Sequence, residues 1–477
     1  MRFSEYFQLN RSQAHLDFVD IPLDTDIPVF LDPGAIKSLD SNWGQELASH
    51  LQSFFGKILK LIKAGNNSEA QKLLASLNER NEFHLGYSSG RSRGHGFGVG
   101  SAHSVWNALT QSKAVTTGLL KDLEDTALLI AGIGTDMISD AVSNILRGPL
   151  IEYTQKMCDY YGIELTPNID SGPIWDPHKG SWHNEFVSLP MTKYGKVILV
   201  PKLLVRHRLC LQYDEFYNHY LLPEMQDEHL KNGSSLIQIL KNGDRRVTKR
   251  SLKNKYGSDK ASVINQTLLR PDVFEDYKQH KEKNPSAPLS HETFNELEEI
   301  EDKIDIIPKF EKLKAIKTGT QQAGDYEDII EELFSILFYP SLCYPTKQHE
   351  IHEGRKRIDI TYNNEAKYGF FYWLSQHYTC PKIYVECKNY SSEISNPELD
   401  QLSSRFSRNR GNVGILVCRK INNKKLVRKR CLDTANDGRG FILAIDDEDL
   451  DEICKEYMSG ANQNFQTLRR LWNFLID

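Results

Sequence analysis

Ile383-Tyr384-Val385-Glu386-Cys387-Lys388 is the stretch that decides the fold of this chain, and Arg357-Ile358-Asp359-Ile360 lies upstream of it. An apolar run that ends in Glu-x-Lys is typical of a strand, on which alternate residues point to the same side. We therefore expect Glu386 and Lys388 to project together from one face. Asp359, arriving on a neighbouring strand, would complete a group of two carboxylates and one ammonium.

Such a trio has the chemistry of a metal-dependent nuclease. Hard cations such as Mg²⁺ take oxygen ligands and keep several waters, so two or three carboxylates suffice to hold one. The bound cation would polarise the scissile phosphate and lower the pKa of a water molecule. Lys388 would orient that water or neutralise charge that develops on phosphorus. No covalent intermediate is needed.

A third carboxylate is expected on a helix over Asp325–Phe338, whose apolar residues recur on one face. Glu327 borders this apolar face, so its carboxylate is predicted to reach the edge of the sheet on which the helix packs. Glu331, one turn further on, is the alternative ligand. The sequence alone leaves the choice between these two glutamates open.

The residues after Gly324 are predicted to form one compact αβ unit with a mixed sheet covered by helices on both faces. A turn at His352-Glu353-Gly354 would join the first two strands. The elements predicted after the first helix are strands at 342–351 and 357–362, an aromatic helix at 366–378, a strand at 382–388, a helix from Asn396, strands at 413–418 and 441–445, and two terminal helices.

In this order the elements resemble the PD-(D/E)XK restriction-endonuclease-like superfamily, and within it the Mrr-type branch. The resemblance covers roughly residues 320–450, with Ile358 where the superfamily often has proline and with an inserted aromatic segment at 368–373. The matching segments are Gly324-Asp325-Tyr326-Glu327, Arg357-Ile358-Asp359-Ile360, Val385-Glu386-Cys387-Lys388, and Glu398-Leu399-Asp400-Gln401-Leu402.

The resemblance implies Mg²⁺-dependent hydrolysis of phosphodiester bonds, usually of DNA, with Mn²⁺ as a substitute for Mg²⁺. The expected metal ligands are Asp359, Glu386 and Glu327. Lys388 and Gln401 complete the expected catalytic set, because the branch often carries a glutamine that lines the site. An isolated Glu-x-Lys on a strand usually lies on a solvated face. The nuclease hypothesis therefore rests on the order of the helix glutamate, the strand aspartate, the Glu-x-Lys strand and the helix glutamine along the chain.

At 477 residues the chain is too long for one ordinary core, and its composition is that of folded domains. We expect an α+β N-terminal domain of unassigned fold over 1–280, a charged linker and helix over 281–320, and the nuclease-like α/β domain over 321–477. Within the first part, residues 44–80 and 104–160 are predicted to be mostly helical. Residues 196–205 are predicted to form a buried strand pair or a strand followed by a turn.

The net charge of −5 excludes a global attraction to nucleic acid, so contact with phosphates must rely on local basic patches. One candidate is a helix starting near Thr248 that displays Lys249, Arg250 and Lys253, for which a solvated helix face is an equal alternative. A second concentration adjoins the predicted site and is favoured as the main phosphate-contact surface. Its leading members are Arg405, Arg408 and Arg410.

Three other sequence patterns are predicted to have structural and not catalytic roles. The glycine-rich stretch at 94–100 lacks the Gly-x-x-x-x-Gly-Lys-Ser/Thr pattern of a phosphate loop and is predicted to be a plain loop. The stretch at 132–140 is predicted to be a loop entering a helix that Thr135 or Asp136 caps. The eight cysteines form no CxxC pair, which favours reduced, buried thiols.

Neither a signal peptide nor an apolar stretch of membrane-spanning length is evident, so a cytoplasmic protein without membrane contact is expected. The interpretation is a prokaryotic-type endonuclease, acting on DNA with RNA as an alternative substrate. By analogy it would be a defence or restriction effector, a homo-oligomer of two or more copies, with a regulatory or recognition domain at its N-terminus. The alternative is a non-catalytic or conditionally active nucleic-acid-binding or assembly protein that keeps the nuclease fold.

Overall fold

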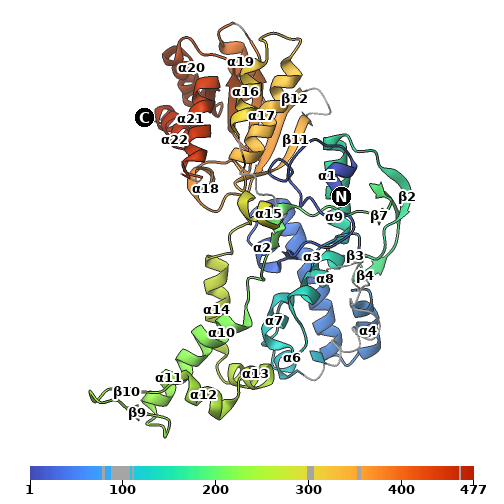
Figure 1. Ribbon diagram of the computed structural model, residues 1–477, viewed down its shortest axis with the longest axis vertical. Coiled ribbons are helices and arrows are strands. Elements are labelled where there is room, and N and C mark those ends of the chain that lie inside the picture. Colours follow the sequence, from blue (N-terminus) through green and yellow to red (C-terminus); the bar gives the residue numbers. More distant parts are fainter. Residues whose placement is uncertain are drawn as a thin grey trace. The chain divides into compact units, whose positions relative to one another are not determined.

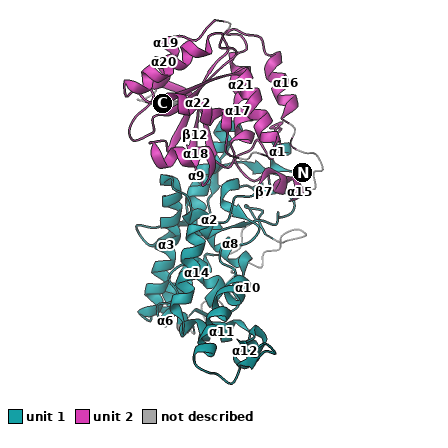
Figure 2. Cartoon of the chain, turned by 90° about the vertical axis from the view of Figure 1, so that its left-hand side faces the viewer, with its two compact units in different colours: residues 1–7, 21–289 teal, residues 8–20, 290–477 magenta. Residues whose placement is uncertain are grey.

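The computed structural model describes residues 1–77, 81–86, 108–109, 112–297, 304, 306–351, 356–390, 392–460 and 463–476. The chain divides into two compact units, coloured separately in Figure 2. The first unit comprises residues 1–7 and 21–289, and the second comprises residues 8–20 and 290–477. This division differs from the expected boundaries at 280 and 320, because residues 8–20 and 290–320 both belong to the second unit.

The first unit is mainly helical, with short strands in two-stranded antiparallel pairs (Figure 1). Its longest helix, α3 (Asn42–Lys63), buries leucines and phenylalanines at helical spacing. The other helices are α1 (Phe3–Tyr6), α2 (Pro33–Lys37), α4 (Asn67–Ala75), α6 (Lys113–Thr116), η1 (Leu123–Asp125), α7 (Thr126–Leu129), α8 (Thr135–Ile145), α9 (Arg147–Tyr161), η2 (Lys202–Leu204), α10 (Tyr213–Phe216), η3 (Tyr217–Leu221), α11 (Leu222–Lys231), α12 (Lys249–Tyr256), α13 (Lys260–Leu268) and α14 (Pro271–Lys283). The paired strands are β1 (Phe30–Leu31) with β8 (Val205–Arg206), β2 (Thr166–Asp170) with β5 (Phe186–Leu189), β3 (Ile174–Asp176) with β4 (Ser181–His183), β6 (Met191–Thr192) with β7 (Gly195–Lys196), and β9 (Gln238–Ile239) with β10 (Arg245–Arg246).

Two expectations for the first unit were wrong in detail. The predicted strand over 196–205 is buried but largely not a strand: residues 197–200 have no regular structure, and the 3₁₀-helix η2 follows them. Helix α8 begins at Thr135 as expected, but its N-cap is Gly134 and no side chain caps it. The glycine-rich stretch at 94–100 lies outside the described residues.

A five-stranded mixed sheet organises the second unit. Its strands are β11 (Leu342–Ile351), β12 (Lys356–Asn364), β13 (Lys382–Lys388), β14 (Val413–Cys418) and β15 (Phe441–Asp446), which neighbour one another in chain order. The pairs β11–β12 and β12–β13 are antiparallel, whereas β13–β14 and β14–β15 are parallel. The parallel pairs need helical crossovers, and a helix stands between the strands of each of them.

Helices cover both faces of this sheet (Figure 1). Helix α19 (Asn396–Ser403) lies over the face of β13 that carries Glu386 and Lys388, and α17 (Ala323–Leu337) packs on the opposite face. The remaining helices are α15 (His291–Leu297), α16 (Ile307–Ala315), α18 (Gly369–His377), α20 (Lys424–Asn436), α21 (Asp447–Met458) and α22 (Gln466–Ile476). One apolar core joins the sheet to α16 to α22 and includes Phe310 and Leu313 of α16. In α15, Nε2 of His291 hydrogen-bonds the backbone carbonyl of Ile336 on α17. These contacts explain why 290–320 is not a free linker.

The elements predicted after Gly324 are confirmed, and β13 and β14 span the predicted residues. The inserted aromatic segment forms α18, whose Phe370 and Phe371 are buried in the core, and it does not separate β12 from β13. The turn predicted at 352–354 lies outside the described residues. Seven of the eight cysteines are buried and Cys387 is half-buried, all as free thiols. None of the helices within the described ranges is long and apolar enough to cross a membrane.

Candidate functional site

Asp359 and Cys387 connect the two strands that carry the predicted site. The β12–β13 pairing ends at Ile360 opposite Val385. One residue beyond this pair, a carboxylate oxygen of Asp359 accepts a hydrogen bond of 2.8 Å from the backbone N–H of Cys387. The Asp359 side chain is therefore held against the strand that bears Glu386 and Lys388, as the sequence predicted.

Glu386, Lys388 and Gln401 form a closed hydrogen-bonded triangle. The ammonium of Lys388 donates to Oε1 of Glu386 at 2.8 Å and to Oε1 of Gln401 at 3.2 Å. The side-chain amide of Gln401 donates to the same Glu386 oxygen at 2.5 Å. Glu386 is 2 % exposed and Lys388 is 8 % exposed. Three of the predicted residues therefore meet in a largely desolvated space, where charge interactions are strong.

The second carboxylate oxygen of Glu386 is buried and has no hydrogen-bond partner among the described residues. A buried, unpaired carboxylate oxygen is costly and rare, so it calls for a cation or a hydrogen-bond donor. Oxygen atoms from Glu386 and Asp359 are the donor type that Mg²⁺ prefers. The residues present therefore fit a hard divalent cation at this position.

Burial raises the pKa values of the two site carboxylates. For Glu386, repulsion from Asp359 adds to burial, while the nearby Lys388 and Arg405 act in the opposite direction. For Asp359, the hydrogen bond from Cys387 and the charge of Lys388 oppose the effect of burial. Burial disfavours the Lys388 ammonium, but the adjacent Glu386 carboxylate outweighs it and raises the pKa of Lys388. Lys388 is therefore a cation at neutral pH.

Glu327 is the helix carboxylate that lies at this site. It is half-buried on α17 and accepts a hydrogen bond of 2.9 Å from the side-chain amide of Gln348. Burial, with repulsion from Asp359, raises the pKa of Glu327 to about 7. A hydrogen bond from the same Gln348 lowers the pKa of Asp359. Gln348 on β11 was not predicted, because an exposed glutamine on a strand carries no sequence signal.

Glu331, the alternative ligand, has other partners. It is fully buried, accepts a hydrogen bond from Ser335, and forms an ion pair of 2.8 Å with Arg11. Since both carboxylate oxygens are used in these contacts, Glu331 is a structural residue. The structure therefore favours Glu327 over Glu331 as the helix carboxylate of the site.

Glu327→Gln is expected to stabilise the metal-free protein at pH 7 and above. The pKa of Glu327 is about 7 in the folded protein, whereas its ordinary value is 4.5, so folding favours the protonated side chain. The stability that comes from this preference is complete below pH 4.5 and is lost as the pH rises to 7. We expect a gain of about 1 kcal/mol over wild type at pH 8, after allowing for solvent screening of a half-buried group. Urea unfolding in EDTA at pH 5 and pH 8 measures the difference. The matched change Asp325→Asn, at an exposed position on the same helix, should give no such pH-dependent gain.

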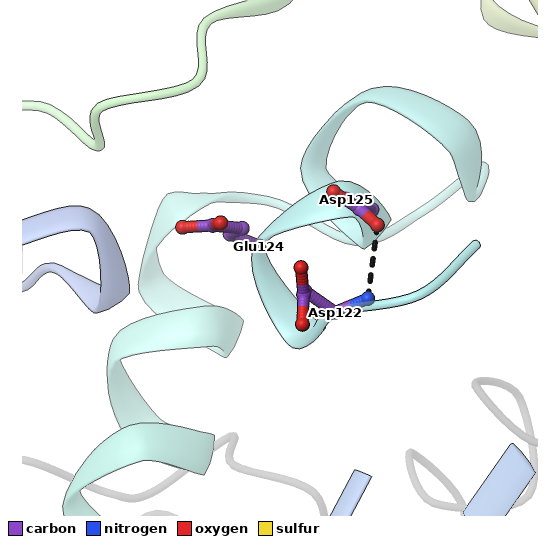
Figure 3. Close-up of side chains that lie close together, drawn as sticks. All are labelled: Asp122, Glu124 and Asp125. Atoms are coloured by element: carbon purple, nitrogen blue, oxygen red, sulfur yellow. Dashed lines mark hydrogen bonds between the residues drawn. The ribbon is translucent and has the colours of Figure 1, made fainter. Parts of the chain in front are cut away.

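The three carboxylates of the predicted site do not all lie within 4.8 Å of one another. Within the described ranges, that degree of convergence is found for Asp122, Glu124 and Asp125 (Figure 3), in the first unit. Two lysines form ion pairs with this group: Lys37 lies 2.6 Å from Glu124, and Lys278 lies 2.7 Å from Asp125. Because ammonium groups occupy the position that a cation would take, we interpret these acids as an ion-pair cluster.

The predicted phosphate-contact residues fall in different units. In the second unit, Arg405 lies close enough to Asp359 and Glu386 to lower the pKa of both, and its buried Nε has no partner among the described residues. Arg408 is exposed, and Arg410 is half-buried beside Tyr384.

In the first unit, α12 begins after Thr248 as predicted, with the Thr248 side chain capping it. Two of its lysines bond to Asn218, at 2.6 Å from Lys249 and 2.9 Å from Lys253, and Arg250 is exposed.

A family model described as a domain of unknown function (DUF8370) matches residues 8–212. This range ends before Lys249 and before Glu327, so it includes none of the predicted site residues. No curated protein and no solved structure matches the chain.

Proposed function

We propose that this protein is a metal-dependent endonuclease that hydrolyses phosphodiester bonds of DNA. The observation that carries the proposal is the buried Glu386 carboxylate, which has one oxygen held by Lys388 and Gln401 and the other without a partner. Asp359 lies across from it on the adjacent strand. The order of antiparallel and then parallel strands, with helices on both faces, supports a restriction-endonuclease-like fold for the second unit.

Asp359, Glu386 and Glu327 would hold Mg²⁺, or Mn²⁺ in its place. When bound, the cation supplies Lewis-acid stabilisation of the phosphate and lowers the pKa of a bound water. Lys388 stays charged beside Glu386 and would neutralise charge developing on the phosphate oxygens. Gln401 fixes the orientation of both side chains through its amide group.

Arg405 is the side chain best placed to hold the substrate at this site. Its charge acts on both Asp359 and Glu386, and the side chain as a whole is half-buried, so its guanidinium could donate hydrogen bonds to a phosphate oxygen at this site. Arg408 and Arg410, on the turn that follows α19, would extend this contact along the backbone of the nucleic acid.

Purified full-length protein is expected to cut DNA only in the presence of a divalent cation. Supercoiled plasmid, linear duplex, single-stranded DNA and RNA are incubated with Mg²⁺, Mn²⁺ or EDTA. Cutting of plasmid without free ends would support an endonuclease, and conversion of RNA alone would change the substrate class. If the protein cuts no substrate with either metal, at protein concentrations that favour self-association, the proposal is overturned in favour of a non-catalytic nucleic-acid-binding or assembly protein.

In a cell, such an activity would suit a defence or restriction effector that acts on invading DNA in the cytoplasm. The first unit would regulate or direct the cleavage, and a homo-oligomer would place two sites on one duplex. These roles rest on analogy: known defence and restriction effectors also join a nuclease domain to a second domain.

A further inference from the structure

The hairpin of β9 and β10 and the helix α12 lie at one end of the first unit, where β10 and α12 both contact α11 (Figure 1). The hairpin pairs Arg245 with Ile239 and Arg246 with Gln238 in antiparallel register. Helix α12 follows the hairpin after two residues, and Thr248 caps it through a hydrogen bond from the N–H of Ser251. The two elements follow one another in the chain and share α11 as a neighbour, and we call them together the basic hairpin–helix.

The basic hairpin–helix concentrates positive charge in a chain that is acidic overall. Between residues 241 and 255 there is one acid, Asp244, and its carboxylate accepts a hydrogen bond from Asn242. The same segment carries seven cations, none of which forms an ion pair within the described part of the chain: Lys241, Arg245, Arg246, Lys249, Arg250, Lys253 and Lys255. Like charges at this density repel one another, so a polyanion is the partner that would relieve the repulsion.

Exposed apolar side chains lie within the same surface. Ile239 is 76 % exposed on β9, directly opposite Arg245, and Leu240 beside it is also exposed. A two-stranded β-ribbon fits a groove of duplex DNA, and apolar side chains flanked by arginines are used there to contact or wedge base steps. Basic side chains on an adjacent helix would then contact the phosphates on either side of the groove.

We propose that the basic hairpin–helix binds double-stranded DNA, with the arginines on phosphates and Ile239 against the bases in a groove. This inference rests on the proposed function, because the surface would hold the duplex on which the second unit acts. It names duplex DNA as the substrate class and assigns its capture to the first unit. The mode is largely independent of base sequence, since cations on phosphates dominate the contact.

Binding of a fluorescent 30-base-pair duplex by the full-length chain, in EDTA and over a range of salt concentrations, tests the proposal. The Glu386→Gln background prevents cleavage during the measurement. Neutralising three exposed arginines should weaken binding at least tenfold at 100 mM salt. It should also reduce the slope of log K against log salt by about 2 to 3, at about 0.9 for each lost phosphate contact. The three changes are Arg245→Gln, Arg246→Gln and Arg250→Gln.

A second variant removes the same amount of charge from other exposed positions of the first unit. It should keep the affinity within about twofold and leave the salt slope unchanged, because those cations would lie far from any bound phosphate. The changes are Lys63→Gln, Lys72→Gln and Lys193→Gln. Ile239→Ser should weaken binding severalfold without changing the salt slope, because an apolar contact releases no counterions.

Three results would overturn the inference. One is wild-type affinity in the arginine variant, and another is an equal loss in the lysine control. The third is an arginine variant that keeps duplex binding but loses the binding of the wild-type protein to anionic phosphatidylserine vesicles, which would identify a membrane surface as the partner. Failure of the nuclease proposal is separate: the arginine variant would then lose duplex binding although the wild-type protein never cuts DNA.

Discussion

Glu386→Gln is expected to lower the rate of metal-dependent DNA cleavage by about a thousandfold, or about 4 kcal/mol of transition-state stabilisation. The amide keeps the shape of the side chain and one oxygen for Lys388, which donates to Glu386 at 2.8 Å. The substitution removes the negative charge and puts an N–H donor in place of one of the two carboxylate oxygens, of which one is buried without a partner. A metal held by Asp359 and Glu386 would lose one of its anionic ligands.

A second readout separates loss of metal from loss of fold. Mg²⁺ should raise the unfolding temperature of the wild-type protein, since a ligand that binds only the folded state stabilises it, and this shift should be absent in Glu386→Gln. Glu448→Gln serves as the control, because Glu448 is an exposed acid of the same unit. It should retain the cleavage rate within about twofold. Metal-dependent cleavage that survives Glu386→Gln would locate the active site elsewhere in the chain.

The second unit was predictable because its signals are local. Apolar runs of strand length mark β13 and β14, and the helical spacing of apolar residues marks α17. The spacing of Glu386 and Lys388 fixes which face of β13 they share, and the next helix brings Gln401 to them. Each of these inferences needs information from only a few neighbouring residues.

What could not be predicted depends on contacts between distant parts of the chain. Residues 8–20 join the second unit through Asp17, which accepts a hydrogen bond of 2.8 Å from the backbone N–H of Tyr344, and through Arg11, which pairs with Glu331. The pair between Arg11 and Glu331 spans 320 positions, and it determines that Glu327 and not Glu331 is left for the site. No periodicity in the sequence records such a contact.

The ion-pair cluster of the first unit was also invisible in the sequence, for the same reason. Asp122, Glu124 and Asp125 form a short acidic run of the kind that is usually solvated. In the structure Asp125 is fully buried, and its partner Lys278 comes from α14, far along the chain. The burial of this run follows from packing of helices whose sequences are more than a hundred residues apart.

Lys278→Met is expected to destabilise the first unit by about 3 to 5 kcal/mol, because it leaves the buried Asp125 carboxylate without its counter-charge. The Lys278 ammonium lies 2.7 Å from Asp125 and 3.2 Å from Asp122. Two backbone N–H groups would still donate to Asp125, but neutral donors do not replace a buried cation. For a unit of this size the unfolding temperature should fall by on the order of 10 °C.

The pH dependence of this loss identifies its cause. Burial already raises the pKa of Asp125 while Lys278 lowers it, so removing Lys278 should raise that pKa further. Protonation then removes the buried charge, and the deficit relative to wild type should narrow as the pH falls from 8 to 5. Lys121→Met is the control, because Lys121 is 56 % exposed in its pair with Glu275 and should cost less than about 1 kcal/mol. Recovery of the lost stability of Lys278→Met by Mg²⁺ or Ca²⁺ at pH 8 would instead show that the three acids can hold a metal once the lysine is gone. A deficit that does not change with pH would contradict the electrostatic explanation and point to lost packing of the lysine side chain.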